Sequence, residues 1–270
     1  MLPQLEAACR FDPGSLVPLL YGNAGRVGWL AADFATVLQA YPEAFAREHA
    51  GVRILSPERM DHAVRELARA SVIRGWRDER YEVRAHPDGD ALFLLERAAF
   101  RRFGLLARAA HLNGWVTTAG GWKLWVARRS PGKPIDPGML DNLVGGGIAA
   151  GASPESTLLK ECDEEAGIAP TLARGAVAAG RLRVRRRVAD GVHDELIHAF
   201  DLELPAQFVP RNRDGEVAEF MLFSPAELGA RLAAGEFTVD AAAATMDFLW
   251  RRAALDDPRI GEALERLRAC

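Results

Sequence analysis

Three glutamates stand close together in one short segment of the chain. Glu161, Glu164 and Glu165 occupy positions i, i+3 and i+4, so a helix would place their carboxylates on one face. Like charges at that spacing repel one another, and a cation between them relieves the repulsion. Hard oxygen ligands of this kind suit Mg²⁺ or Mn²⁺, which bind phosphate-bearing substrates through a few carboxylates. The alternative is a solvated acidic patch, the commoner outcome for a run of charge on a helix.

The segments around these glutamates favour the metal hypothesis. Glycines that permit backbone shapes forbidden to other residues precede them, at Gly145, Gly146, Gly147 and Gly151. Ser153 is suited to cap the helix that follows, Pro154 to its first position, and Gly167 to a left-handed stop. A glycine loop, an acidic helix and a helix stop at this spacing are less typical of a solvated patch than of a metal site.

This spacing resembles the Nudix box. In that pattern a Gly is followed by five residues, Glu, seven residues, Arg-Glu, an apolar residue, any residue, Glu-Glu, any residue, Gly and an apolar residue. Gly146 would open the box and residues 160–168 would close it. Two positions depart from the pattern, because Ala152 replaces the first Glu and Lys160 replaces the Arg. In the family those side chains mainly orient the loop and the catalytic Glu, so their loss puts rate and geometry in question more than metal binding.

The resemblance implies a MutT-like, metal-dependent hydrolase. Its metal ion, Mg²⁺ or Mn²⁺, would be held by Glu161, Glu164, Glu165 and the carbonyl of Gly146. Glu161 would also take the proton of the attacking water. Nudix proteins often add an acid from the region that corresponds to residues 214–216. Glu216 is the best match there and a second catalytic candidate, and Glu219 is the reserve.

Longer sequence segments outside the box indicate a particular group within the Nudix family. Residues 95–106 and 111–116 look like the join between the N-terminal and Nudix domains of proteins related to fungal thiamine pyrophosphokinase. Further matches lie at residues 137–144, 200–205 and 214–217. Members of that group are associated with hydrolysing thiamine diphosphate and its oxidised analogues to monophosphates, which is the substrate class that the resemblance implies. Two alternatives stay open: a Nudix hydrolase of nucleotides or nucleotide sugars, and a Nudix-fold binding module that has lost its chemistry.

Side chains of a predicted hairpin supply candidate substrate contacts. Its strands are expected at residues 109–117 and 122–128. Trp115 would either stack on an aromatic substrate or pack the sheet. Arg128, Arg129 and Lys133 follow the second strand and are candidates for binding phosphate oxygens, with ordinary loop charges as the alternative.

A second hairpin is expected between residues 175–188 and 195–204. Alternation places Arg186 on the apolar face of the first strand, where an arginine needs an anionic partner from the protein or from a ligand. We expect it to bind the departing phosphate. His198 shares the apolar face of the second strand, where a hydrogen-bonded core histidine is more common than a catalyst.

The whole chain has room for two modest domains. We place a small α+β domain at residues 1–105 and a Nudix domain at residues 106–270. The fold class is α/β, with a mixed sheet sandwiched between helices in the second domain. Hydrophobic residues make up 49% and charged residues 26% of the 270, which is typical of a globular protein. The net charge of −3 gives no broad basic field for a nucleic-acid polymer.

The cysteines and the N-terminal segment indicate no further site and no targeting signal. Cys9, Cys162 and Cys270 are scattered without CxxC spacing, so neither a zinc site nor a disulfide framework is indicated. No run reaches the length of a membrane span, and the N-terminus lacks a basic segment followed by a long apolar core. We expect a cytoplasmic protein that acts on a small-molecule diphosphate, without a nucleic-acid or membrane partner. The oligomeric state stays open, with a homodimer as one candidate.

Overall fold

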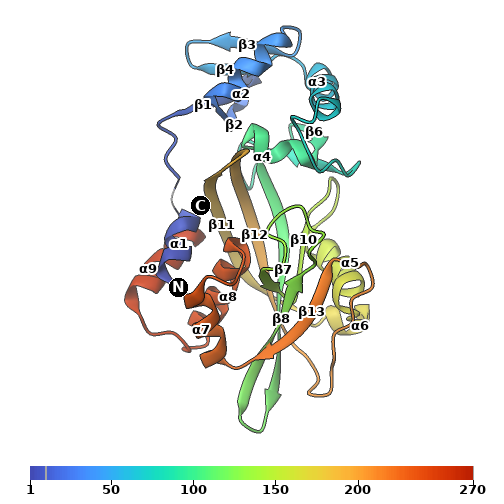
Figure 1. The fold of residues 1–270 in the computed structure, drawn as a ribbon, viewed down its shortest axis with the longest axis vertical. Helices are drawn as coiled ribbons and strands as arrows, with labels where there is room; N and C mark the ends of the chain where they lie inside the picture. Colours follow the sequence, from blue (N-terminus) through green and yellow to red (C-terminus); the bar gives the residue numbers. More distant parts are fainter. Residues whose placement is uncertain (10, 270) are drawn as a thin grey trace.

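The chain folds into two bodies stacked along the long axis of the molecule (Figure 1). The computed structural model describes residues 1–9 and 11–269, so Cys270 lies outside the described residues. Both bodies mix helices and strands, which confirms the predicted α/β class with an N-terminal α+β domain. Among the described residues, no helix is both long and apolar enough to span a bilayer.

The upper body contains two small sheets and three short α-helices. Its strands are β1 (Leu16–Tyr21), β2 (Gly25–Ala31), β3 (Phe45–Glu48), β4 (Gly51–Ile54), β5 (Arg80–Val83) and β6 (Phe93–Glu96). Its helices are α2 (Ala32–Val37), α3 (Pro57–Arg69) and α4 (Phe100–Phe103), with 3-10 turns at Gly22–Ala24, Leu38–Ala40 and Arg97–Ala99. The first four strands pair in the order β2-β1-β4-β3, and β5 pairs with β6. The core of this body includes Met60, Val64 and Leu67, which lie one helical turn apart along α3.

The lower body is built on one large mixed sheet. Its strands are β7 (Leu106–Thr118), β8 (Gly121–Arg129), β9 (Leu140–Asn142), β10 (Val144–Gly147), β11 (Val177–Val188), β12 (Gly191–Glu203) and β13 (Val217–Phe223). The main order is β11-β12-β7-β8-β13, while β10 pairs with the first half of β7 and β9 pairs with the last residues of β8. Both predicted hairpins are present, as β7–β8 and β11–β12. Strands β7 and β12 run parallel.

Helices cover both faces of this sheet, as predicted. They are α5 (Pro154–Ala166), α6 (Pro170–Ala173), α7 (Pro225–Ala234), α8 (Val239–Arg251) and α9 (Pro258–Arg268). Alternation along β12 sorts the two faces, because Phe200 and Leu202 pack in the core that α5 covers while Ile197 packs in the core that α8 covers. The acidic helix α5 and the alanine-rich helix α8 therefore lie on opposite sides of the sheet (Figure 1).

The first helix of the chain belongs to the lower body. Helix α1 (Leu2–Cys9) packs beside α9 and α8, so the first and last helices of the chain lie together (Figure 1). Leu5 and Ala8 are almost completely buried in the core formed with α8 and α9. The boundary near residue 105 stays a prediction, to which the structure adds that residues 2–9 cross from the N-terminal side onto the other body.

Candidate functional site

The glycine loop and the acidic helix pack directly against each other. Ser153 caps α5 by accepting a hydrogen bond from the backbone N–H of Ser156 at 3.0 Å, and Gly167 ends it with a left-handed φ of 63°. Strand β10 carries Gly146 so close to the helix that a Cβ there would lie 2.4 Å from Cγ of Glu161. The glycine is therefore required for the contact, and the helix start and stop expected from the sequence are confirmed.

The three glutamates of α5 have different surroundings. Glu161 and Glu164 both bind Lys160, whose Nζ lies 3.1 Å from Glu161 Oε1 and 2.9 Å from Glu164 Oε2. The cation that relieves their repulsion in this structure is thus the lysine that departs from the family pattern. Although burial opposes its charged form, the hydrogen bonds to Glu164 and Glu161 raise the pKa of Lys160.

Glu165 is the buried member of the set, with 6% of its surface exposed. Its Oε2 accepts a hydrogen bond of 2.9 Å from the backbone N–H of Gly145. Burial raises the pKa of Glu165 to about 8, and the charges of Glu161 and Asp141 add to the rise while the Gly145 hydrogen bond opposes it. Because burial disfavours the ionised form of Glu165, a nearby cation would stabilise this carboxylate more than it would stabilise an exposed one.

The loop before β13 brings two more acids to Glu165. One carboxylate oxygen each from Glu165, Asp214 and Glu216 lie within 4.8 Å of one another. Lys133, from the loop after β8, forms an ion pair with Glu216, and burial lowers the pKa of this lysine. Two predicted site residues, Glu216 and Lys133, are therefore brought to the acidic helix. Asp214 joins them from the tripeptide Asp214-Gly215-Glu216 that pointed to Glu216.

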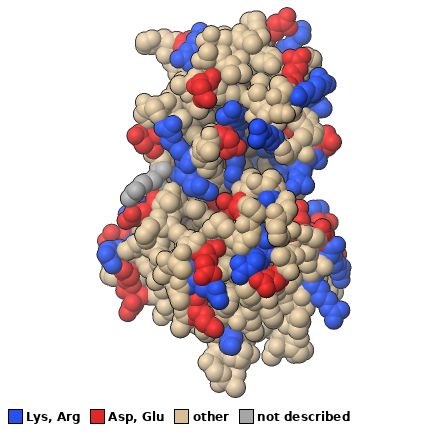
Figure 2. All heavy atoms as spheres, viewed as in Figure 1, with Lys and Arg blue, Asp and Glu red and all other residues tan. Residues whose placement is uncertain are grey.

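These acids line a cleft of about 860 Å³ between the two bodies. The lower body contributes the carboxylates of α5, the glycines of β10, Arg129 and Lys133. The upper body contributes Tyr81 and four arginines, Arg74, Arg77, Arg97 and Arg101. Lysine and arginine side chains gather at the waist between the two bodies (Figure 2). A volume of this size suits a small-molecule substrate.

Three consecutive residues of β5 in the upper body, Arg80, Tyr81 and Glu82, contact the glycine loop. The hydroxyl of Tyr81 occupies the space that a side chain on Gly147 would need. The backbone N–H of Ala150 donates to the carbonyl of Arg80 at 2.8 Å, and the N–H of Gly151 donates to Oε1 of Glu82 at 3.2 Å. Strand β5 therefore holds the loop that precedes α5.

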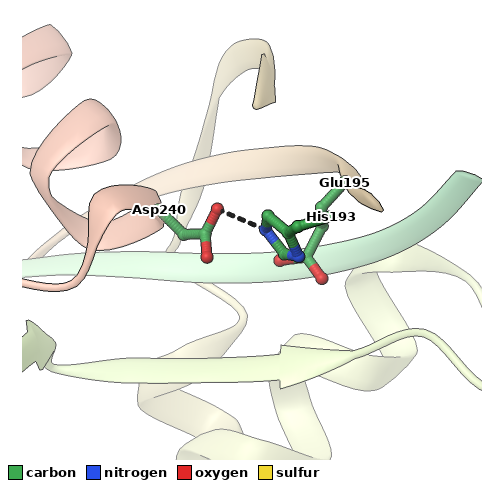
Figure 3. Close-up of side chains that lie close together, drawn as sticks. All are labelled: His193, Glu195 and Asp240. Carbon is green, nitrogen blue, oxygen red and sulfur yellow. Dashed lines mark hydrogen bonds and ion pairs between the residues drawn. The ribbon is translucent and has the colours of Figure 1, made fainter. Parts of the chain in front are cut away.

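A second polar cluster lies on the other side of the cleft, where β12 meets the start of α8. His193 and Glu195 point from β12 toward Asp240 of α8 (Figure 3). Nε2 of His193 lies 2.8 Å from Oδ1 of Asp240, and His193 is 5% exposed. Burial acts to lower the pKa of His193, but the charge and the hydrogen bond of Asp240 act against it, and that pKa is raised. Burial raises the pKa of Glu195. This cluster was not expected from the sequence, because Asp240 is 45 residues beyond Glu195 and only the alternation of β12 links His193 with Glu195.

Arg186 is not among the residues that line the cleft, so its contact with the departing phosphate stays a prediction. It lies on the face of the sheet that α8 covers, beside Leu182 and Val184, and its buried Nε has no hydrogen-bond partner among the described residues. Burial opposes ionisation of Asp240, but the charges of His193 and then Arg186 lower the pKa of Asp240. The anion near Arg186 is thus a protein carboxylate on the side away from α5.

Arg128 and Trp115 also fall outside the cleft. Arg128 forms an ion pair with Glu219 and donates to the carbonyl of Gly138 at 3.0 Å, while the next residue, Arg129, lines the cleft and binds Asp141 at 2.6 Å. Trp115 packs on the core under α8, with the guanidinium of Arg252 3.7 Å from its ring centre. Of the three cations predicted after the second strand, Arg129 and Lys133 therefore line the cleft and Arg128 does not, and Trp115 follows the packing alternative.

Comparisons with known proteins agree with this arrangement. The NUDIX domain model matches residues 104–244, and a domain of unknown function, DUF4743, matches residues 5–107. Nudix hydrolase 24, chloroplastic, of Arabidopsis thaliana is 33% identical over 90% of this chain and 70% of its own length. Nudix hydrolase 20, chloroplastic, of the same plant is 32% identical over 83% of this chain and 65% of its own length.

A crystal structure of DR0079 from Deinococcus radiodurans has 22% identity and a TM-score of 0.46, and the match covers 59% of this chain and 92% of that one. The domain match spans more than half of the chain, and it contains the glycine loop, the acidic helix and the loop with Glu216. The chain belongs to the Nudix hydrolase family, whose general reaction is the hydrolysis of a diphosphate linkage.

Proposed function

We propose that the protein hydrolyses a small-molecule diphosphate in the cleft between its two bodies, using a divalent cation held by the acids around α5. The observation that carries this proposal is the convergence of Glu165, Asp214 and Glu216 beside the glycine loop. These acids come from two segments about fifty residues apart in the chain. A helix with a merely solvated acidic face would not bury one glutamate and draw two further acids to it.

The residues present fit Mg²⁺ or Mn²⁺. All the side-chain donors are carboxylates, which are hard ligands, and the raised pKa of Glu165 reflects a buried negative charge without enough compensation. Glu161, Glu164 and Glu165 would hold the cation together with the carbonyl of Gly146 and the acids of the loop before β13. When bound, the cation neutralises phosphate oxygens and lowers the pKa of a water.

The chain's own residues supply the proton transfer. The Glu161 carboxylate lines the cleft and takes a proton from the water as the water oxygen bonds to one phosphorus. The bridging P–O bond breaks, and the leaving phosphate takes the electron pair. Glu216 is the second candidate for the base, but its carboxylate is engaged in an ion pair with Lys133, which fits better with a role in binding a cation.

The substrate we propose is thiamine diphosphate or, in preference, an oxidised analogue of it. Support comes from the strings at residues 103–116, 137–144 and 200–205, which resemble the thiamine-pyrophosphokinase-related group. Within the structure, residues from the first two strings line the cleft or flank it, including His111 and Asp141. Tyr81 supplies an aromatic side chain to the cleft in place of the tryptophan that the sequence suggested.

The test is a panel of diphosphates with and without Mg²⁺. We expect metal-dependent release of phosphate, fastest for oxo- or oxythiamine diphosphate, slower for thiamine diphosphate and for nucleoside triphosphates. Glu161→Gln should lower turnover by about 10² or more. The matched control is Glu155→Gln on the same helix, because Glu155 does not line the cleft. A nucleotide or nucleotide sugar ranked first would refute the substrate, and full activity in Glu161→Gln would refute the site.

A further inference from the structure

Most cations that line the cleft are already neutralised by the protein. Each of the following has a carboxylate partner within ion-pair distance: Lys133 with Glu216, Lys160 with Glu164, Arg129 with Asp141, and Arg97 with Glu79. A cation engaged in this way has less to offer a substrate, because binding a phosphate would compete with an existing partner. The cleft cations outside these ion pairs are Arg74, Arg77 and Arg101, and they are the better candidates for binding an anionic substrate.

Arg101 is the cation of the cleft that differs most from this group. It lines the cleft from α4 of the upper body and is half-buried. Within residues 1–9 and 11–269, its guanidinium forms neither an ion pair nor a hydrogen bond. Its charge reaches β12: burial is what chiefly raises the pKa of Glu195, and Arg101 opposes that rise. In the described part of the chain, Arg74 and Arg77 also have no carboxylate partner, but both are exposed at the rim of the cleft.

The backbone around Arg101 is held in place. The carbonyl of Arg101 lies against the β11–β12 turn so tightly that a Cβ on Gly191 would come within 2.1 Å of it. On either side of Arg101 and Arg102, Phe100 and Phe103 are buried in the core of the upper body. Arg101 therefore reaches the cleft from a backbone that is held in place, so binding a ligand need not order this segment of the chain.

We infer that Arg101 binds a phosphate group of the substrate, so that the N-terminal domain of unknown function forms one wall of the binding site. A half-buried guanidinium without a partner costs free energy that an anion recovers, and its planar fork matches phosphate oxygens. The inference rests on the proposed function for the nature of the ligand. It assigns to the upper body a direct part in binding the diphosphate.

The experiment compares Arg101→Gln, Arg101→Lys and the control Arg102→Gln. Arg102 is the next residue on α4, does not line the cleft, and packs over the ring of Phe34 with its guanidinium 4.9 Å from the ring centre. The probe is inorganic pyrophosphate in buffer containing Mg²⁺, titrated calorimetrically into the full-length protein. KM and kcat are measured in parallel on the diphosphate that the wild type hydrolyses, and thermal unfolding confirms that each variant is folded.

We expect Arg101→Gln to raise the Kd for pyrophosphate and the KM about tenfold or more, as for loss of a charge-assisted hydrogen bond. Arg101→Lys should lie between the wild type and Arg101→Gln, because it keeps the charge and loses the fork. Arg102→Gln should stay within about threefold of the wild type on the same scale. Should Arg101→Gln fail to fold, Arg101→Lys still decides, since it should weaken binding more than Arg102→Gln does.

Two results separate this inference from the proposed function. If the wild type hydrolyses a diphosphate and Arg101→Gln leaves Kd and KM unchanged, the inference is wrong and the function stands. If no diphosphate is hydrolysed but pyrophosphate binding still depends on Arg101, the function is wrong and the binding role stands. Equal weakening by Arg101→Gln and Arg102→Gln would also overturn the inference, because it would indicate a general effect on α4.

Discussion

Gly147→Ala should separate the two bodies at the glycine loop. A Cβ at Gly147 would lie 1.6 Å from the hydroxyl oxygen of Tyr81 and 2.7 Å from its Cζ, whereas ordinary contact begins at 3.4 Å. The ring has little freedom to move, because it packs edge-on against Phe100 at 5.4 Å and beneath the guanidinium of Arg97 at 5.3 Å. Overpacking of this kind costs about 1–3 kcal/mol. We expect a loss near the upper end, because a buried ring must be displaced.

The contact with Tyr81 can be tested by a double-mutant cycle. Tyr81→Leu removes the ring atoms that would collide, so Gly147→Ala should cost at least about 1 kcal/mol less in that background. The measurement is the free energy of unfolding in urea for the four proteins, with kcat/KM as a second readout. Gly120→Ala is the matched control, since nothing lies within 4 Å of a Cβ there. An equal cost of Gly147→Ala in both backgrounds would show that Tyr81 is not the obstacle.

Three further changes test other parts of the structure by the free energy of unfolding. Leu5→Ala should destabilise the protein by about 2–4 kcal/mol, because Leu5 is fully buried between α1 and the lower body; a loss below about 0.5 kcal/mol would mean that α1 is not docked. Gly229→Ala, inside α7 and in open space, should stabilise it by about 0.5–1 kcal/mol; a loss would contradict the helix. Burial, with Arg108 and Arg181, lowers the pKa of His198 to about 4, so the native state binds fewer protons than the unfolded state between that value and 6.5. Stability should therefore fall as pH drops from 6.5 to 4, by roughly 1–2 kcal/mol after allowance for partial exposure, and His198→Gln should remove this fall; parallel curves would exclude His198 as its cause.

Much of the acidic half of the site could be predicted from sequence because it is encoded locally. Glu161, Glu164 and Glu165 lie within five residues, and their spacing alone places them on one face of a helix. The cap at Ser153 and the stop at Gly167 then fix where that helix begins and ends. Local periodicity also predicted both hairpins of the large sheet, since a strand and its turn are neighbours in the chain.

The surroundings of Arg186 and His198 depend on information that a single strand does not carry. Alternation correctly put Arg186 on the face shared with Leu182 and Val184, but it does not say which helix covers that face. The covering helix is α8 and not α5, so the arginine meets Asp240. For His198, the same alternation suggested a hydrogen-bonded core position, yet its Nε2 has no partner among the described residues.

The contribution of the upper body lay beyond sequence reasoning for a related reason. Tyr81 and Arg101 belong to segments with no catalytic pattern, and they reach the cleft only because one folded body docks on the other. Contacts of that kind depend on the surfaces of two finished bodies, whereas periodicity describes one element at a time. The acids, glycines and alternation of the sequence therefore indicate the half of the cleft that carries the carboxylates, but not the half that faces it.

The docked upper body contacts the glycine loop next to Ala152, the position where the family pattern has a glutamate. In the family the glutamate at the position of Ala152 helps to orient this loop; here strand β5 holds it through Arg80, Glu82 and Tyr81 at positions 147, 150 and 151. The contact with Arg80 is made by its backbone carbonyl. The contact with Glu82 is made by a carboxylate that also forms an ion pair with Arg108 at 2.7 Å. The upper body thus holds this loop from outside through backbone and side-chain contacts of β5. The loop's geometry should then depend on the docked domain more than on any side chain at position 152.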